Sequence, residues 1–420
     1  MDASATVDLL EVIARVRHGA SGLGVSAYQQ RDQAIAQLAQ RVKSEQNAIL
    51  EANTLDLETS RELAISGLLL TWLKLTPERI HNTIQILEHL AVLPTPTLTR
   101  LSTYQGMASS HQGWQVTPLG VIGLLYEAFP ELALILGGMC LKTANGLLLR
   151  GGSEATHTNQ ILAELMADTL EQAQLPPTSI QALPCDRSVP LKDLVVQSQI
   201  DAIVPYGRPS FTQPLIRQAT LPIFNPVMGN CYLFWSASSS NELVRTILVG
   251  SHQGLPDAVN AVEKVLVDIN VKRPLLNLLW SDLTERGFEL QGDAEMAAEF
   301  PDHLTLANPE DWQQPYLRKV VAFKWVAHLT EAIDWINTHS SGHADCIATE
   351  SYRESRQFTL AISSATVHIN ACPRFSRQSS GPHSTVALGM CGRGGFRPGP
   401  IGLGSLLTTK QILHGEPSPS

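Results

Sequence analysis

The sequence predicts an α/β protein of two or three domains with a mostly parallel sheet. Three observations predict this class. The chain has 420 residues, which is too long for one small core. Hydrophobic residues make up 44% of it, which suits an ordinary globular protein, and charged residues only 16%, which leaves few surface charges. Beyond residue 120, short apolar segments typical of buried strands alternate with helical segments.

The first hundred residues are predicted to be helical. Apolar residues recur there at the 3–4 residue spacing of an amphipathic helix, as at Ala34, Ile35, Leu38, Ala39 and Val42. A later helix is expected to begin with Thr76 as its N-cap, Pro77 at its first position and Glu78 near the positive end of its dipole. Pro94 then marks a break.

Strands and helices are expected to alternate after this break. Buried strands are predicted at residues 121–125, 147–149, 202–204, 221–224, 265–267, 320–323 and 367–370. Helices are predicted at residues 155–170, 243–250, 258–262 and 332–337. This order predicts βαβ units, hence parallel strands. Residues 376–400, rich in Gly, Ser and Arg, are expected to form an irregular loop, and the tail from residue 415 to be disordered.

Charge and hydropathy exclude several classes of partner. The 30 basic and 39 acidic residues give a net charge of −9, which argues against nucleic acid or an anionic membrane as partner. Arginines 374, 377, 393 and 397 lie among few aromatic residues, which favours a solvated or anion-binding loop. No signal peptide is evident at Met1, and the most apolar run, 132–141, is about half of the ~20 residues that a membrane span needs. We therefore expect a cytoplasmic protein.

No metal site is predicted. The six cysteines include no Cys-x-x-Cys pair, so neither a zinc ribbon nor a thioredoxin-type motif is present. His339, His343 and Cys346 have suggestive spacing, but a fourth ligand is not nearby and a loop after a helix explains them better.

A series of segments, in order along the chain, resembles the γ-glutamyl phosphate reductases. Residues 118–128, PLGVIGLLYEA, are similar to the family's PLGVIGVIYEARPN, and residues 141–152 are similar to its LKTGNAVILRGG. Shorter matches fall at residues 49–56, 341–343, 370–375 and 399–403. The series spans roughly residues 5 to 410, and its order makes it more specific than any one match.

This resemblance implies an aldehyde-dehydrogenase-type fold. It implies a Rossmann-like NADP-binding domain with the N-terminal helices at 1–240, a catalytic α/β domain at 241–375, and a loop, dimerising arm and tail at 376–420. The family reduces γ-glutamyl phosphate with NADPH to glutamate 5-semialdehyde in proline biosynthesis. The partners implied are thus NADP(H), a small glutamate-derived substrate and a second copy of the chain in a homodimer. Proteins of this fold lack the G-x-G-x-x-G fingerprint, as this sequence does.

The cofactor-binding positions that the resemblance implies lie in two turns. They are Arg150, Gly151, Gly152 and Ser153 in the first turn, and Pro205 and Gly207 in the second. In the second turn the family's PRGG becomes PYGR, so that Arg208 replaces a glycine, and Pro209 removes an N–H donor. Arg208 either reaches an NADP phosphate or is a solvated loop arginine.

The catalytic position carries the most consequential departure. The family attacks the acyl phosphate with a cysteine thiolate in a pattern like QRPSVCNAMETLLV. Here Pro256, Asn260 and Glu263 keep the register, and the cysteine position is Val259, beside Asn260. An isopropyl group cannot attack, and losing an essential nucleophile costs about 10⁴–10⁶ in rate.

Other residues do not readily replace this cysteine. An anhydride at Asp257 would hydrolyse easily, and Cys231 is expected to be a buried thiol on a strand. Further departures point the same way: Phe129 and Glu131 stand where the family has arginine and asparagine, and a carboxylate at 131 would repel an anionic substrate. Pro315 replaces a glutamate that holds the nicotinamide ribose in such folds.

Three hypotheses follow. In the first, which these departures favour, the family reaction is lost or strongly weakened, and the chain is a paralogue that binds a ligand or pairs with an intact reductase. In the second, the chain is an active reductase with an unrecognised nucleophile. In the third, it has a purely structural or interaction role.

Overall fold

The computed structural model describes residues 8–95, 99–102, 111–186, 188–254, 256–379 and 385–414. The chain divides into two compact units. Unit 1 comprises residues 1–224, 377–388 and 401–420, and unit 2 comprises residues 225–376 and 389–400. The sequence placed the boundaries after residues 240 and 375, and its assignment of functions to these segments stays a prediction.

Unit 1 begins with helices, as predicted. They are α1 (Leu9–Val25), α2 (Tyr28–Ser44), α3 (Gln46–Glu62), α4 (Gly67–Leu73) and α5 (Pro77–Val92). The apolar stripe predicted for α2 is buried throughout. The predicted start of α5 is confirmed, because the Thr76 side chain accepts a hydrogen bond from the Arg79 amide and Pro77 occupies the first turn.

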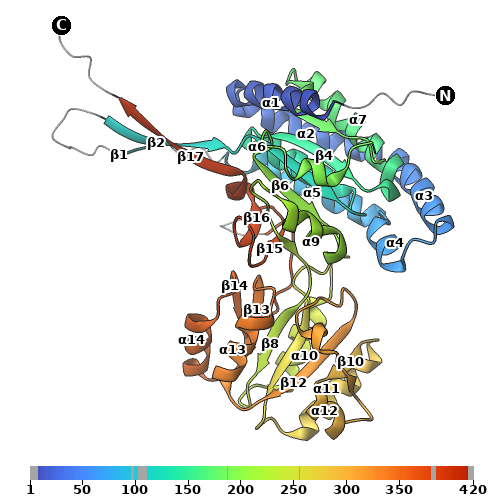
Figure 1. Ribbon diagram of the computed structural model, residues 1–420, viewed down its shortest axis with the longest axis vertical. Coiled ribbons are helices and arrows are strands. Elements are labelled where there is room, and N and C mark those ends of the chain that lie inside the picture. The colour runs from blue at the N-terminus through green and yellow to red at the C-terminus, as the bar shows by residue number, and fades with distance from the viewer. Residues whose placement is uncertain are drawn as a thin grey trace. The chain divides into compact units, whose positions relative to one another are not determined.

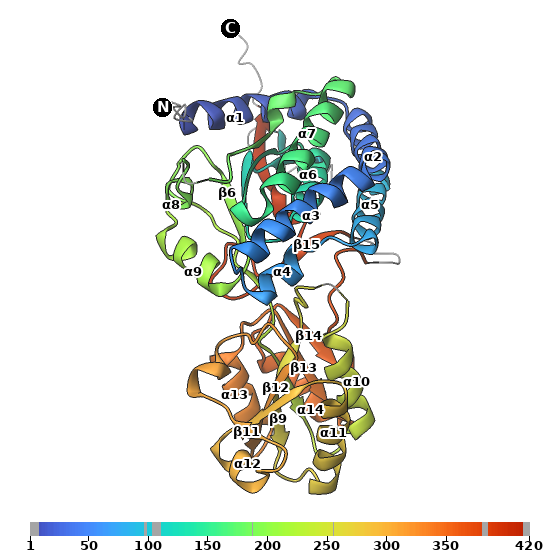
Figure 2. The ribbon, with the colours of Figure 1, turned by 90° about the vertical axis from the view of Figure 1, so that its right-hand side faces the viewer.

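A four-stranded parallel sheet forms the centre of unit 1, in the order β5-β4-β3-β6. Its elements are β3 (Val121–Tyr126), α6 (Glu131–Thr143), β4 (Gly146–Gly151), α7 (Thr156–Gln172), β5 (Ile180–Ala182), α8 (Leu191–Leu194), β6 (Ala202–Tyr206) and α9 (Pro209–Gln218). Helices α1 and α9 pack on one face, in a core that includes Val16, Leu148 and Leu215. A second group of helices packs together in unit 1, and it consists of α2, α3, α5, α6 and α7 (Figure 2).

The predicted strand at 221–224 is wrong. Ile223 makes a single bridge to Ile203, and the Pro222 carbonyl accepts from the Ile203 amide at 3.0 Å. Pro222 has no N–H to donate, so the pairing does not extend into a ladder.

An antiparallel ribbon completes unit 1. Strands β1 (Thr99–Ser102), β2 (His111–Pro118) and β17 (Leu407–His414) form it, with β2 in the middle (Figure 1). The pairing of β2 with β17 runs from Pro118 opposite Leu407 to His111 opposite His414. We call these three strands the arm.

Unit 2 contains a seven-stranded parallel sheet in the order β11-β10-β12-β9-β8-β13-β14. Its strands are β8 (Cys231–Trp235), β9 (Val262–Asp268), β10 (Glu289–Gly292), β11 (Thr305–Leu306), β12 (Val320–Val326), β13 (Ala344–Ala348) and β14 (Thr366–Ile369). Helices α10 (Asn241–Ser251) and α11 (Arg273–Glu285) pack on one face, near α12 (Ala294–Glu299), and α13 (Leu329–His339) and α14 (Tyr352–Ala361) on the other. The strands predicted at 265–267, 320–323 and 367–370 are confirmed within small shifts.

Two other predictions for the C-terminal half are wrong. Residues 258–262 are not a helix but a turn that leads into β9, and Ala258 adopts a left-handed conformation with φ of +37°, which a helix cannot contain. Residues 376–400 include regular structure, since β15 (Ala387–Cys391) pairs with β7 (Pro226–Val227) and with β16 (Gly399–Gly402). The tail from residue 415 lies outside the described residues.

Among the described helices, none combines the length and hydropathy that crossing a membrane requires.

Candidate active site

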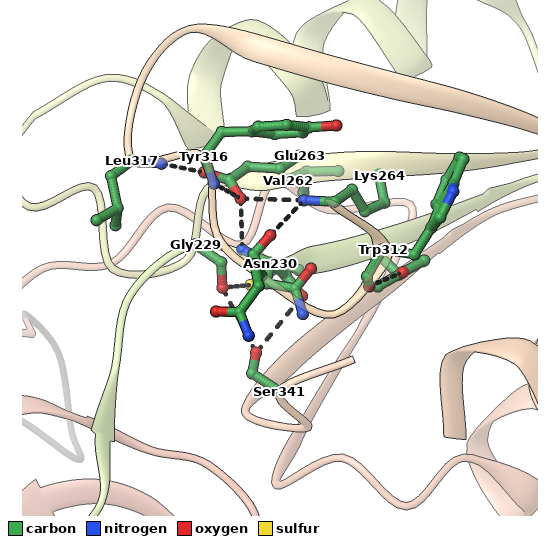
Figure 3. Close-up of polar contacts among 12 residues, drawn as sticks. Gly229, Asn230, Val262, Glu263, Lys264, Trp312, Tyr316, Leu317 and Ser341 are labelled. Carbon is green, nitrogen blue, oxygen red and sulfur yellow. Dashed lines mark hydrogen bonds and ion pairs between the residues drawn. The ribbon is translucent and has the colours of Figure 1, made fainter. Parts of the chain in front are cut away.

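Val259, the predicted nucleophile position, lies at the amino edge of the unit 2 sheet. Strands β8, β9 and β13 are neighbours and run in parallel, so the segments that precede them meet at this edge. These segments carry Gly229 and Asn230 before β8, Val259 and Asn260 before β9, and Ser341 before β13. Figure 3 shows Ser341, Gly229 and Asn230 directed toward one another.

The turn that carries Val259 is held by buried hydrogen bonds. The Val259 carbonyl accepts from the Gly229 amide at 3.0 Å and from His343 Nε2 at 2.9 Å. Asn260 Nδ2 donates to the Pro373 carbonyl at 2.9 Å. The Val259 side chain is only 1% exposed, so it belongs to the packed interior. The turn to which the resemblance assigns the nucleophile is therefore ordered and buried, and it carries a valine side chain at that position.

His343 connects this turn to Ser341 and to the Cys231 thiol. Its Nδ1 lies 2.8 Å from Ser341 Oγ, and its Nε2 lies 3.2 Å from Cys231 Sγ. Since the Val259 carbonyl can only accept, Nε2 must carry the hydrogen and Nδ1 must accept from the Ser341 hydroxyl. Burial lowers the pKa of His343 to about 4, so the ring is neutral near pH 7.

Cys231 is consequently not an activated nucleophile. The nitrogen that faces its sulfur already carries a hydrogen and cannot take the thiol proton. The side chain is fully buried, and burial raises the pKa of the Cys231 thiol well above its ordinary value. The prediction of a buried thiol on a strand is confirmed, with Cys231 as the first residue of β8.

Glu263 joins the segments of this edge, as Figure 3 shows. Its buried carboxylate accepts from the amides of Asn230 at 2.8 Å, Tyr316 at 2.9 Å and Leu317 at 3.0 Å. Lys264 Nζ lies 3.4 Å from the same carboxylate and 3.9 Å from the centroid of the Tyr316 ring. Burial lowers the pKa of Lys264, and Glu263 opposes that shift. The carboxylate thus fixes the start of β8 and the segment before β12 together.

In the sequence, Glu263 serves only to set the register of the resemblance, and its role in joining these segments was not predicted. A signal was present, because Glu263 and Lys264 are adjacent charges inside an otherwise apolar strand. Pro315 immediately precedes the two amides that Glu263 binds and follows the 3₁₀ turn Pro309–Trp312. It supplies no carboxylate, and the loss of a ribose contact there stays a prediction.

The second candidate region is the carboxyl edge of the unit 1 sheet. The chain passes from β3 through β4 to β5 and then returns to the other side of β3 as β6, so a topological switch point lies between β3 and β6. Open α/β sheets bind their ligands outside the carboxyl ends of the strands at such a point. Glu127 follows β3, and Arg208 follows β6.

An ion pair occupies this switch point. Arg208 Nη2 lies 2.6 Å from Glu127 Oε1, and Arg208 Nε and its backbone amide each lie 3.1 Å from Glu127 Oε2. Gly207 fits closely beside it, since an added Cβ would stand 2.9 Å from Glu127 Cβ. The sequence suggested that Arg208 either reaches an NADP phosphate or is a solvated loop arginine. In the structure its guanidinium forms an ion pair with Glu127 of the same chain.

The other predicted cofactor positions lie at the same edge or just inside it. The strand register aligns Gly151 with Tyr126 and Tyr206, Ser153 is exposed, and Pro205 is internal to β6. The Arg150 guanidinium donates to the carbonyls of Gly151 and, at 2.6 Å, Asp186. The Glu154 carboxylate packs against Gly152 and accepts from the Ala128 amide at 2.7 Å.

These residues, as arranged, do not fit a dinucleotide phosphate. Glu127 and Glu154 place carboxylates at the edge, and each accepts a backbone amide that would otherwise be available to an anion. Burial raises the pKa of Glu154. The cations of the two predicted turns, Arg150 and Arg208, already donate to groups of the chain itself.

The structure revises the interpretation of residues 129 and 131. Phe129 is buried, with its ring centroid 4.8 Å from that of Trp72 and 5.5 Å from that of Tyr206. Glu131 is buried in an ion pair with Arg79, whose Nε lies 3.1 Å from Oε1. The predicted repulsion of an anionic substrate by Glu131 is therefore offset by the positive charge of Arg79.

The described residues hold no group of three or more His, Cys, Asp or Glu that could bind a metal ion. His339 instead stacks on Trp335, with ring centroids 4.0 Å apart.

Comparison with solved structures defines the class of the fold. The NADP-dependent glyceraldehyde-3-phosphate dehydrogenase of Bacillus halodurans, complexed with NADP, superposes with a TM-score of 0.71 at 17% identity, over 98% of this chain and 92% of that one. A lactaldehyde dehydrogenase gives a TM-score of 0.72 at 11% identity, over 98% and 92%. The fold is thus of the aldehyde-dehydrogenase type, as predicted.

Comparison of sequences defines the family. The γ-glutamyl phosphate reductase 2 of Synechocystis is 44% identical over 410 residues, which cover 96% of this chain and 97% of that relative. The γ-glutamyl phosphate reductase of Thermotoga maritima is 27% identical and superposes with a TM-score of 0.86, over 97% of this chain and 98% of that one. No family model matches the chain. The chain belongs to the γ-glutamyl phosphate reductase family.

Proposed function

We propose that this chain is a member of the γ-glutamyl phosphate reductase family in which reduction of γ-glutamyl phosphate is lost or strongly weakened. The observation that carries the proposal is the amino edge of the unit 2 sheet. There Val259 fills the nucleophile turn, and the thiol of Cys231 is buried and protonated. The family reaction needs a thiolate that displaces phosphate and holds the acyl group as a thioester.

Ser341 is the hydroxyl that best resembles a replacement nucleophile, since it donates to His343 Nδ1 at 2.8 Å. Two properties argue against this role. A ring whose pKa is about 4 is a weak general base at neutral pH. An oxygen ester is also a poorer hydride acceptor than a thioester, so acylation of Ser341 would not lead efficiently to the aldehyde.

We also propose that NADP(H) binds weakly to this chain. NADPH supplies the hydride of the family reaction. Support comes from the carboxyl edge of the unit 1 sheet, where Glu127 holds Arg208 and the Glu154 carboxylate packs against Gly152. A thermal-shift titration with NADPH measures binding directly. A shift that saturates at micromolar NADPH would overturn weak binding, and it would favour a ligand-binding paralogue over a purely structural role.

The remaining proposals concern partners. The arm supports a homodimer, and the same surface would allow the chain to pair with an intact family member and regulate it. A small glutamate-derived molecule is the ligand class that the family suggests, and the cytoplasm is the proposed location. Light scattering on the purified chain, alone and mixed with an intact reductase from the same organism, tests the assembly.

Activity is tested in the reverse direction. Purified chain at high concentration is incubated with glutamate 5-semialdehyde, phosphate and NADP, and NADPH formation is followed. The Thermotoga maritima protein serves as the comparison enzyme. We expect no phosphate-dependent NADPH formation above the blank without protein, and sustained turnover would overturn the proposal.

A further inference from the structure

A cavity at the base of the arm carries three cations and no acid. It has a volume of about 430 Å³ and lies in unit 1, where β2 and β17 meet the ends of α1 and α6 and the start of α2. The described residues that line it include Arg31, Lys142 and Lys410, together with Gln115 and Thr117, and none of them is acidic. Such a lining is unusual in a chain of net charge −9.

Arg31 is built into this cavity with a donor left unmet. Only 7% of the residue is exposed, and its Nη1 is fixed by the carbonyls of Leu23 at 2.9 Å and Ser26 at 2.7 Å. Its Nε is buried and has no partner among the described residues. Buried guanidinium nitrogens are normally paired, so an unmet N–H on a residue that lines a cavity is unusual. Burial also lowers the pKa of Arg31, and the nearby Asp32 carboxylate opposes that shift.

Lys142 adds a second buried cation. It is fully buried in the last turn of α6, and its Nζ lies 2.7 Å from Asp32 Oδ1 and 3.4 Å from the Ala91 carbonyl. Lys410, on β17, is exposed and completes the set.

Stabilising helix ends explains part of this cluster. Arg31 binds carbonyls at the end of α1, and Lys142 binds one at the end of α5, where cations interact favourably with the helix dipoles. This role uses Arg31 Nη1 and Lys142 Nζ. It accounts neither for the unmet Arg31 Nε nor for Lys410, which lines the cavity from β17.

From this geometry we infer that the cavity at the base of the arm binds a small oxyanion, a carboxylate or phosphate group on a metabolite-sized molecule. The planar guanidinium of Arg31 matches two oxygens of either group. Val116 and Leu407 give the same cavity an apolar wall for the rest of the ligand, and its volume is that of a small-molecule site. This site is separate from both sheet edges described above.

Calorimetry and thermal denaturation with inorganic phosphate and with glutarate test the inference, at constant ionic strength with chloride as the background anion. We expect saturable binding of phosphate, glutarate or both by the wild-type chain. Binding by phosphate alone or glutarate alone would identify the oxyanion. Lys410→Gln, which alters an exposed side chain, is expected to weaken binding at least about threefold, because one of three cations is lost. Arg31→Lys keeps the charge but not the fork and should weaken it further.

Lys272→Gln is the matched control, since Lys272 is an exposed lysine of unit 2. It corrects for the general stabilisation that phosphate gives many proteins. Absence of saturable binding to both anions would overturn the inference. So would equal binding by the wild type, Lys410→Gln and Lys272→Gln.

Discussion

The two candidate regions differ in their chemistry. At the amino edge of the unit 2 sheet, buried hydrogen bonds hold a turn whose predicted nucleophile position carries the unreactive side chain of Val259. At the carboxyl edge of the unit 1 sheet, charged groups are present but bind one another, as Glu127 binds Arg208. A cysteine introduced at residue 259 should therefore not restore activity at the first edge, because its thiol would be buried. The second should respond to a single substitution that frees a cation.

The largest effect is expected from Glu263→Ala, which tests how firmly the unit 2 edge is held. The substitution removes the acceptor of three backbone amides and leaves Lys264 buried without its carboxylate. We expect a loss of about 3–5 kcal/mol in the free energy of unfolding, measured by urea denaturation. Glu289→Ala breaks an exposed pair with Arg318 and should cost less than about 1 kcal/mol. Similar losses for both variants would show that the edge is not held by Glu263.

The pH dependence of stability tests the same edge through His343. Its pKa is lowered from 6.5 to about 4 by burial, so between these values the unfolded state binds more protons than the folded state. The contribution of His343 to the free energy of unfolding is therefore fully present above pH 6.5. It falls as the pH drops toward 4, by about 3 kcal/mol for this residue alone. His252 and His368, whose pKa values burial also lowers, act in the same direction. Asp345 and Glu154, whose pKa values burial raises, act in the opposite one.

His343→Gln isolates this contribution. The difference between the wild type and the variant in urea stability, followed from pH 6.5 to 4, should shrink as the pH falls. A difference that stays constant across that window would mean that folding does not lower the pKa of His343.

A smaller effect is expected at the unit 1 edge. Glu127→Gln removes the charge that holds Arg208, so the guanidinium becomes available to a phosphate. We expect NADPH affinity, measured by fluorescence titration, to rise about three- to tenfold, or roughly 1 kcal/mol. Arg208→Gln leaves the Glu127 carboxylate in place and should bring no gain. Equal NADPH affinities of Glu127→Gln and Arg208→Gln would show that the Glu127–Arg208 ion pair does not block phosphate binding at this edge.

The smallest effect is expected from Val259→Cys. Because residue 259 is 1% exposed, the new thiol should add nothing to the number of thiols that react quickly with a disulfide reagent in the folded protein. It should also leave NADPH formation at the level of the wild type. A rapidly reacting additional thiol, with rescued turnover, would show that the turn opens and that only one group was missing.

The sequence allowed local features to be predicted but not the contacts between distant ones. Strands β9, β12 and β14 were predicted from short runs that contain apolar residues. For β8 only a strand at Cys231 was expected, and β10, β11 and β13 were not predicted. Helix α5 was predictable because Thr76 and Pro77 mark its start. The turn at 258–262 was mistaken for a helix because Ala258, Ala261 and Val262 have helical spacing. The left-handed conformation at Ala258, which excludes a helix, leaves no trace in its side chain.

Both candidate sites depend on contacts between residues that lie far apart in the sequence, and these contacts could not be predicted from the sequence. Glu127 and Arg208 are 81 residues apart, and only the parallel pairing of β3 with β6 brings them together. Likewise, His343 meets Val259 across 84 residues. The resemblance assigns the nucleophile position to Val259, and this assignment stays a prediction. The hydrogen bonds that hold the turn around Val259 could be found only from the fold.

The absence of a working nucleophile is tested most directly by a single-turnover experiment. The chain is mixed with glutamate 5-semialdehyde and NADP without phosphate, so that any acyl-enzyme formed accumulates and releases one NADPH per site. The Thermotoga maritima protein is run in parallel. We predict no burst of NADPH and no gain in intact mass for this chain. A burst that approaches one NADPH per chain, with an acyl adduct on any residue, would contradict the account.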